Sequence, residues 1–307
     1  MASDSGGARP RIVGLEGPRA RQSFALLRLY AWLSRGRGLQ RAAWELGRLG
    51  GTDASALVAV DGVRVRVYLS DGYWAHLLFS AGRYEPEVEA ALEQVMRPGI
   101  PFIDCGANIG YWSLLAAVRH QARVIAIEPA ATSFERLVEN VKLNGDVVET
   151  RRAAVWSKDH LVLSLVTHAR RHAGASVVNR RERIGVAGYA VEEVESVTLD
   201  QIYRERFAGE DSVAIKLDVE DAEIEALRGA QELLRSCDAL LVYEDHGSDP
   251  ECRVSQEVLK VPDYGVYRWE DRFVQISSLD DVRRIKVCVH TGYNFFGMRE
   301  DSRFLSR

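Results

Sequence analysis

The stretch DCGANIG, residues 104–110, decides the fold of this 307-residue chain. Apolar residues 101–103 precede it, and a helix-forming apolar segment, residues 111–117, follows it. The pattern predicts a short buried strand, a tight glycine turn and the start of a helix. In open α/β sheets this is the place where nucleotide-like ligands bind.

The first residue of this stretch indicates which ligand the turn accepts. Asp104 stands where the dinucleotide-binding pattern G-x-G-x-x-G has its first glycine. A carboxylate that faces the ligand repels a pyrophosphate and attracts a cation. S-adenosylmethionine, with an adenosine body, an α-ammonium and a sulfonium, fits that requirement better than NAD does. Gly106 and Gly110 let the backbone approach the ligand and the next helix closely, and Asn108 can hydrogen-bond within the turn or to the ligand.

From residue 101 onward the sequence alternates between strand and helix. Further buried strands are predicted over 123–128, 147–155, 212–219 and 238–243, and helices over 132–143 and 222–234. An extra strand is predicted over 160–166, and the basic segment 168–190 is predicted to be a loop whose Tyr189 could stack on a sugar. Alternation of this kind predicts an α/β fold, with a mostly parallel sheet covered by helices on both faces.

The first hundred residues have a different organisation. Residues 1–20 are predicted to be a disordered tail, followed by a helical region over 21–48. Asp61-Gly62 separates two apolar runs and is a strong hairpin signal, and Pro86 begins a helix that runs to Met96. The expected organisation is therefore a helical and hairpin extension over 21–98, followed by the α/β domain over 99–307.

Composition and charge limit the function classes. Hydrophobic residues make up 47% of the chain, the net charge is −4 and the isoelectric point is about 6.0. A large core is therefore expected, and nucleic acid is not expected as a partner. Four cysteines without a C-x-x-C pair favour a reducing compartment, here taken as the cytoplasm, and Cys105 and Cys237 are expected in the core.

The arginine-rich N-terminal region needs its own interpretation. Its apolar run, residues 24–33, is short and is interrupted by Arg28, so no transmembrane segment is predicted. An amphipathic helix packed on the body or on a partner subunit is expected, and the second case would give a homodimer formed through this region. Attachment to a membrane surface is the alternative.

Polar residues cluster at the carboxyl ends of successive predicted strands. The clusters are Asp104–Gly110, Glu128-Pro129, Asp218–Glu223 and Glu244–His246. Ligands of open α/β sheets bind at these ends, so the clusters are expected to line one cleft. Glu128 is placed to accept hydrogen bonds from both hydroxyls of a ribose.

Three segments of this chain resemble the FkbM family of S-adenosylmethionine-dependent methyltransferases. They are FIDCGANIGY (102–111), IKLDVEDAE (215–223) and RYEPE (83–87), and the resemblance covers about residues 60–250. It implies the class I methyltransferase fold, a Rossmann-like sheet of seven strands whose last strand, near 292–298, is antiparallel. It also implies methylation of a hydroxyl group on a sugar or another natural product. One departure is Asp221, where the family usually has glycine.

The resemblance also implies which residues contact the cofactor, S-adenosylmethionine, and its product S-adenosylhomocysteine. They come from the glycine turn and from the ends of the neighbouring strands. The expected set is Asp104, Gly106, Ala107, Asn108, Gly110, Tyr111, Glu128, Pro129, Ala153 and Asp218.

Methyl transfer from a sulfonium to an alcohol depends mainly on alignment, but the alcohol must lose its proton. His246, with an ordinary pKa of about 6.5, and Asp218 are the expected bases, and Glu244 and Lys216 complete the expected catalytic set. Each has a structural alternative. His246 could be a surface histidine, Asp218 could cap the helix that follows, and Lys216 could form an ion pair.

Other readings of the cleft remain open. Asp218, Glu244 and His246 could together bind Mg²⁺, although their spacing is not that of a dedicated metal site, so no metal is expected. The main expectation is a small-molecule O-methyltransferase. The alternatives are a cofactor-binding partner subunit without activity, an NAD-dependent oxidoreductase and a nucleic-acid methyltransferase.

Overall fold

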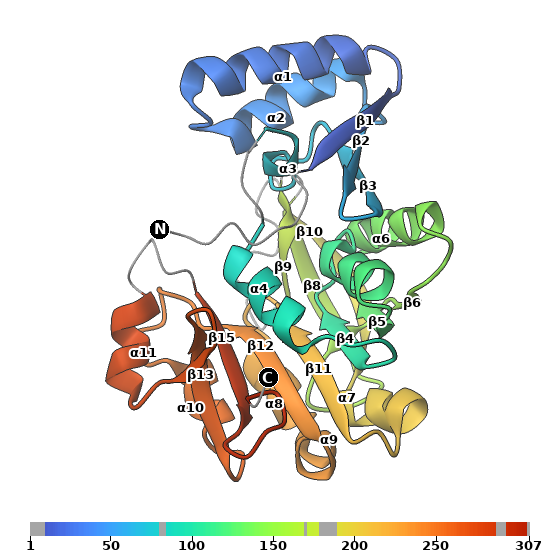
Figure 1. Cartoon of the computed structure of the whole chain (residues 1–307). Helices are drawn as coiled ribbons and strands as arrows, with labels where there is room; N and C mark the ends of the chain where they lie inside the picture. Colours follow the sequence, from blue (N-terminus) through green and yellow to red (C-terminus); the bar gives the residue numbers. More distant parts are fainter. Residues whose placement is uncertain (1–9, 80–83, 169–170, 178–188, 287–292, 306–307) are drawn as a thin grey trace.

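The computed structural model describes residues 10–79, 84–168, 171–177, 189–286 and 293–305 (Figure 1). The predictions for residues 1–9 and 178–188 and for the side chain of Tyr189 lie outside what it describes. No helix in the described ranges is long and apolar enough to cross a membrane. Cys105 and Cys237 are buried, as predicted.

The central sheet is mixed and contains eight strands. They are β4 (Pro101–Cys105), β5 (Arg123–Ile127), β6 (Glu149–Arg151), β11 (Ser212–Leu217), β12 (Asp238–Glu244), β13 (Tyr264–Trp269), β14 (Phe273–Gln275) and β15 (Asn294–Arg299). Their order is β14-β13-β15-β12-β11-β4-β5-β6. The five strands from β12 to β6 are parallel, and β15 is inserted antiparallel between β12 and β13.

This sheet confirms the predicted α/β class and corrects the predicted strand number. Counted from β6, the first seven strands have the expected arrangement. The antiparallel one is β15, the strand that comes last in the chain. The eighth, β14, pairs only with β13. It forms because the chain reverses at Asp271, whose φ of 58° is left-handed, and makes a short hairpin at the sheet edge.

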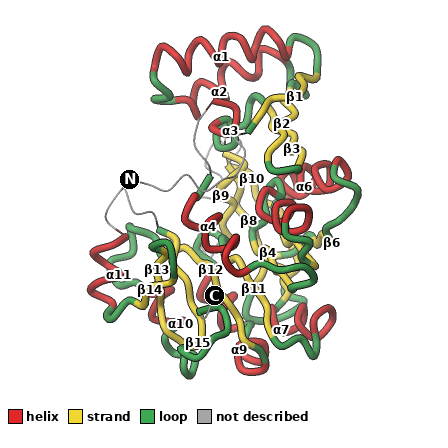
Figure 2. The backbone as a smooth tube through the Cα atoms, viewed as in Figure 1, coloured by secondary structure: helices red, strands yellow, loops and turns green. Residues whose placement is uncertain are grey.

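Helices cover both faces of the sheet (Figure 2). They are α4 (Pro86–Val95), α5 (Tyr111–Leu114), α6 (Ala131–Leu143), α7 (Leu199–Ile202), α8 (Glu223–Arg228), α9 (Gln231–Ser236), α10 (Arg253–Val258) and α11 (Leu279–Lys286), with short π-helical turns η2 (Leu115–Arg119) and η4 (Tyr203–Phe207). Alternate strand residues point to opposite faces, so Ala214 joins one core cluster and Ile215 the other. The single helix predicted over 222–234 is two helices. The chain breaks at Gly229, where a Cβ would lie 2.2 Å from the Trp156 carbonyl oxygen.

The N-terminal region forms a separate layer at one end of the molecule (Figure 1). It contains β1 (Arg11–Glu16), α1 (Ala20–Ser34), α2 (Leu39–Gly47), η1 (Arg48–Gly50), β2 (Ser55–Val60), β3 (Val63–Tyr68) and α3 (His76–Phe79). The β2–β3 hairpin confirms the Asp61-Gly62 prediction. The tail prediction is wrong for residues 11–16, because β1 pairs with β2 and so gains a hydrogen-bonded partner. The helix predicted over 21–48 is broken between α1 and α2, where Gly36 and Gly38 have left-handed φ values of 78° and 68°.

Two asparagines of α6 attach this layer to the central domain. The Asn140 and Asn144 side-chain oxygens accept the backbone N–H groups of Arg66 and Arg64, at 2.7 and 2.9 Å. Their amide groups donate in return to the carbonyl oxygens of the same two residues. The free edge of β3 is thereby satisfied by side chains rather than by another strand.

A third sheet corrects two predictions. It contains β7 (Ala154–Val155), β8 (Val162–His168), β9 (Arg171–Val177) and β10 (Tyr189–Val197) in the order β7-β10-β8-β9. The strand predicted over 147–155 is therefore divided between two sheets. The predicted extra strand corresponds to β8. The predicted loop 168–190 instead contains β9 and the start of β10, because β8 pairs with both.

Candidate active site

A buried lysine and two carboxylates form the floor of a cleft at the carboxyl ends of β4 and β11. Lys216 and Asp104 are opposite each other in the parallel pairing of these strands, and both are buried. The Lys216 Nζ donates to Asp218 Oδ2 at 2.7 Å, and Ser113 Oγ donates to Asp104 Oδ2 at 2.5 Å. Burial raises the pKa of Asp104. Burial alone would lower the pKa of Lys216, but the carboxylates around it raise that pKa overall, so the ammonium form is retained.

The glycine turn closes tightly over this floor. A Cβ on Gly106, which has a φ of 80°, would lie 1.8 Å from the Asp218 carbonyl oxygen, so no larger residue fits. Asn108 also has a left-handed φ, 52°, and its side-chain oxygen accepts the Trp74 indole N–H at 3.0 Å. Gly110 does not line the cleft; it stands at the N-terminus of α5, against Leu137.

Glu128 follows β5 and lies beside the turn. Its two carboxylate oxygens accept the backbone N–H groups of Asn108 and Ala130, at 2.8 and 2.9 Å. Each oxygen retains a second lone pair for another donor. Burial raises the pKa of Glu128 to about 7 despite these hydrogen bonds.

The cleft contains about 630 Å³ of empty space, including its open mouth. It brings together nine residues that were predicted as site residues, two more, Val219 and Glu220, from the predicted Asp218–Glu223 cluster, and four aromatic residues that were not predicted. The predicted residues in its lining are Asp104, Gly106, Ala107, Asn108, Tyr111, Glu128, Pro129, Lys216 and Asp218. The others are Tyr73, Trp74, Tyr84, Trp112, Val219 and Glu220. Ala153 lines a smaller hollow of about 260 Å³ that shares Gly106 and Pro129 with the cleft.

Five aromatic rings form one wall of the cleft: Tyr73, Trp74, Tyr84, Tyr111 and Trp112. Their ring centroids lie 5.2–6.1 Å apart, and the Tyr73 and Tyr84 hydroxyls are 2.5 Å apart. Three of the rings precede the first strand of the central sheet. Among these three, only Tyr84 had a sequence signal, the RYEPE segment, which carried a family resemblance but no assigned role, and Tyr73 and Trp74 had none.

A group of three carboxylates reaches the cleft through Asp218, while Glu85 and the predicted catalytic residue Glu244 are not in the cleft lining. Oxygens of Glu85, Asp218 and Glu244 all lie within 4.8 Å of one another. Glu85 Oε2 accepts the Trp112 indole N–H at 2.9 Å. Burial, followed by repulsion from Asp218, raises the pKa of Glu244. The set Asp218, Glu244 and His246, considered as an alternative metal site, is therefore only partly brought together, since the group contains Glu85 and not His246.

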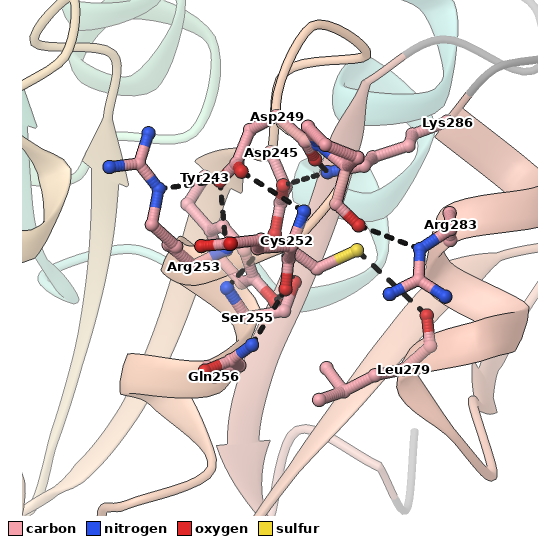
Figure 3. A network of polar contacts seen from close by, with 12 residues as sticks. Tyr243, Asp245, Asp249, Cys252, Arg253, Ser255, Gln256, Leu279, Arg283 and Lys286 are labelled. Atoms are coloured by element: carbon pink, nitrogen blue, oxygen red, sulfur yellow. Dashed lines mark hydrogen bonds and ion pairs between the residues drawn. The ribbon is translucent and has the colours of Figure 1, made fainter.

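His246 lies at the rim rather than in the cleft lining. Its side chain is 59% exposed, its Nε2 lies 3.9 Å from Glu244 Oε2, and its ring stacks on Tyr293. The residue between them, Asp245, points into a different, fully buried network that involves Lys286 and Ser255 (Figure 3). Adjacent strand-end residues thus have opposite roles, because side chains alternate across a strand.

The loop after β11 contains Asp221, the residue that stands where the family usually has glycine. Glu220 and Asp221 have φ values of 50° and 75°, a region that glycine adopts more easily than other residues. Asp221 therefore occupies a position for which glycine is suited. Burial, followed by Asp218 and Asp221, raises the pKa of Glu220.

The strand order of the central sheet and a ligand cleft at the ends of β4, β5 and β11 define a class I methyltransferase. The profile of the methyltransferase FkbM domain matches residues 104–283, more than half of the chain. This chain belongs to the FkbM methyltransferase family.

Individual relatives are more distant. A tRNA(Phe) (4-demethylwyosine(37)-C(7)) aminocarboxypropyltransferase of Pyrococcus horikoshii is 34% identical over 104 residues, so the chain spans about a third of that curated relative. The solved FkbM methyltransferase of Methylobacillus flagellatus has 15% identity and a TM-score of 0.43, over 75% of this chain and 54% of its own. The TYW2 protein of M. jannaschii, solved with AdoMet, has 11% identity and a TM-score of 0.37. The match covers 80% of this chain and 83% of that protein's chain. The expectation that nucleic acid is not a partner gains no support from these relatives.

Proposed function

We propose that this chain is an S-adenosylmethionine-dependent O-methyltransferase that acts on a hydroxyl group of a small molecule, a sugar or another natural product. The observation that carries the proposal is the division of one cleft into two sides. The glycine turn and Glu128 form one side, and the aromatic wall with Asp218 forms the other. Glu85 and Glu244 lie outside this lining, with carboxylate oxygens within 4.8 Å of Asp218. Family membership supports methyl transfer, and the aromatic wall and proton acceptors favour a small hydroxylated acceptor.

The first side fits S-adenosylmethionine. Glu128 has acceptor capacity left for ribose hydroxyls, and Gly106 leaves no side chain where the ligand approaches. Carboxylates outnumber the single lysine around the cleft, which favours a cationic ligand over a diphosphate. When bound, this cofactor supplies a methyl group on a positively charged sulfur.

Glu244 is the proton acceptor that we favour on the second side. The raised pKa of Glu244 lies closer to neutral pH than that of an ordinary glutamate. A general base is most effective when its pKa is near the pH at which the enzyme works. Asp218 is already paired with Lys216 and is better suited to orienting the acceptor. His246, 3.9 Å from Glu244 and exposed, offers a path for the proton to solvent. Lys216 places a positive charge beside Asp218, so we expect the reaction to proceed without Mg²⁺.

Calorimetry tests the cofactor side. S-adenosylmethionine and S-adenosylhomocysteine should bind and NAD⁺ should not. Glu128→Ala should weaken binding at least about tenfold, since hydrogen bonds to charged groups contribute about 1.5–3 kcal/mol. Glu193→Ala, an exposed glutamate on β10, is the matched control. Preferential binding of NAD⁺ would overturn the proposal.

Transfer of a labelled methyl group tests the acceptor side. We expect transfer to hydroxylated small molecules, retained after chelation of divalent cations, and none to tRNA. Glu244→Gln should lower kcat by about 100-fold without changing cofactor affinity, and His246→Ala should lower it less. Transfer to tRNA would favour the activity class of the P. horikoshii relative, and cofactor binding with no transfer to any acceptor would favour an inactive partner subunit.

A further inference from the structure

Helix α1 has two apolar faces, and only one of them is buried by the described protein. Ala20, Ser23 and Leu27 face inward. On the opposite side Leu26, Leu29, Trp32 and Leu33 are exposed by 43%, 53%, 75% and 67%. In Figure 1 α1 is the outermost element at its end of the molecule. Soluble monomers rarely leave a continuous apolar strip of this kind in water, so the strip marks an interaction surface.

The charged residues of the region that contains this strip are mainly arginines. Residues 10–50 contain eight arginines and two glutamates, in a chain whose net charge is −4. All eight arginines are exposed. None of them forms an ion pair with any part of the chain that the structure describes. Positive charge is thus concentrated at the one end of the molecule that also exposes the apolar strip.

We propose that α1 docks on an anionic lipid bilayer, lying in its surface with Leu26, Leu29, Trp32 and Leu33 below the headgroups. An apolar face flanked by arginines is the pattern of a helix that lies in a membrane interface, and tryptophan is favoured at that depth. The arginines would then face lipid phosphates and carboxylates. The helix has 15 residues and would lie on the bilayer rather than cross it.

Two other occupants fit the surface less well. In a symmetric dimer through α1, Arg21 and Arg28 of one helix would approach those of the other, and α1 contains no acidic residue to offset their repulsion. A nucleic acid would match the arginines but would leave the three leucines in contact with phosphates and water. A bilayer with anionic headgroups matches both the charge and the apolar strip.

Co-sedimentation of the full chain with vesicles tests the proposal. Vesicles with 30% phosphatidylserine, about a third of the lipid, should bind the protein at least tenfold more strongly than pure phosphatidylcholine vesicles. Leu29→Asp/Leu33→Asp should lower the partition coefficient at least tenfold. The matched control, Leu161→Asp/Leu259→Asp, changes leucines of 38% and 45% exposure elsewhere and should bind as the wild type does.

Circular dichroism and S-adenosylmethionine binding establish that each variant is folded, and neither should change. Equal binding of the wild type and Leu29→Asp/Leu33→Asp to the anionic vesicles would overturn the proposal. So would a concentration-dependent dimer that this double variant abolishes while vesicles bind neither protein. Binding of tRNA that survives the double variant, without vesicle binding, would assign the arginines to nucleic acid instead.

Discussion

Two buried lysines, Lys216 and Lys286, each form an ion pair with an aspartate, but the surroundings of the two pairs differ. Lys286 meets one carboxylate, Asp245, at 2.6 Å, and both side chains are fully buried. Lys216 meets Asp218 at 2.7 Å and also lies in the field of Glu85 and Asp104. The first group is balanced one to one, whereas the second has more negative charge than it can neutralise internally.

Hydrogen bonding separates the two groups further. Asp245 Oδ2 accepts both the backbone N–H and the hydroxyl of Ser255, and Lys286 also donates to the Asp249 carbonyl oxygen (Figure 3). The Asp245 carboxylate is therefore satisfied within the protein. Around Lys216 the pKa values of Glu85, Asp104 and Glu244 are all raised, mainly by burial. The difference indicates that the Lys286 network holds the fold, while the Lys216 cluster keeps acceptor capacity for ligands.

Breaking the balanced pair should have the largest effect on stability. Lys286→Met leaves Asp245 buried without its cation, which should lower the free energy of unfolding by about 3–5 kcal/mol. Urea unfolding at pH 7.5, about the physiological value, measures it. The control Lys260→Met removes an exposed pair with Glu257 and should change stability by less than about 1 kcal/mol. Similar values for both variants would remove the distinction between a structural pair and a surface pair.

The excess negative charge at the cleft should appear as a pH dependence of stability. Burial raises the pKa of both Glu128 and Glu223 to about 7. A raised carboxyl pKa contributes stability that is complete below about pH 4.5 and is lost as the pH rises through about 7. Unfolding at pH 5.5 should therefore require about 1–3 kcal/mol more than at pH 8, as measured in urea.

A variant isolates this effect from the rest of the chain. Glu223→Gln should flatten the pH profile in part, because it removes one of the carboxyl groups of this region whose pKa is raised. His120 acts in the opposite direction, since burial lowers its pKa and its charging destabilises the fold as the pH falls. A wild-type profile that Glu223→Gln leaves unchanged would contradict the assignment to the carboxylates of this region.

The smallest expected effect concerns the loop beside Lys216. Asp221→Gly should raise stability by up to about 1 kcal/mol by relieving the left-handed backbone. It should also lower the pKa of Glu220, because it removes a neighbouring charge. NMR titration of the Glu220 carboxyl measures this shift. The control Asp263→Gly changes another residue with a left-handed φ, 63°. It should raise stability in the same way but leave the pKa of Glu220 unchanged.

The sequence predicted the fold well where local patterns repeat along the chain. Apolar strands ending in Asp104, Glu128 and Asp218 predicted the parallel sheet and the glycine side of the cleft, and the structure brings these residues together. Breaks in helices were missed. The interruption at Gly229 depends on the Trp156 carbonyl, which lies more than seventy positions away in the chain.

The acceptor side could not be predicted because it depends on distant segments meeting. Tyr73 and Trp74 belong to the N-terminal layer, which Asn140 and Asn144 of α6 attach to the central domain, and Tyr84 follows that layer in the chain. His246 was misplaced for a related reason. A strand-end position does not tell which face a side chain takes, and the buried Asp245–Lys286 contact fixes that orientation.

The aromatic wall has a consequence for how enzymes of this kind diversify. Tyr73, Trp74 and Tyr84 precede residue 104, where the family profile begins. Under the proposed function, these three rings of the acceptor side are therefore encoded upstream of the segment that carries the donor site. Recombination that replaces the leading segment could redirect the enzyme to another compound while its methylating half is inherited intact.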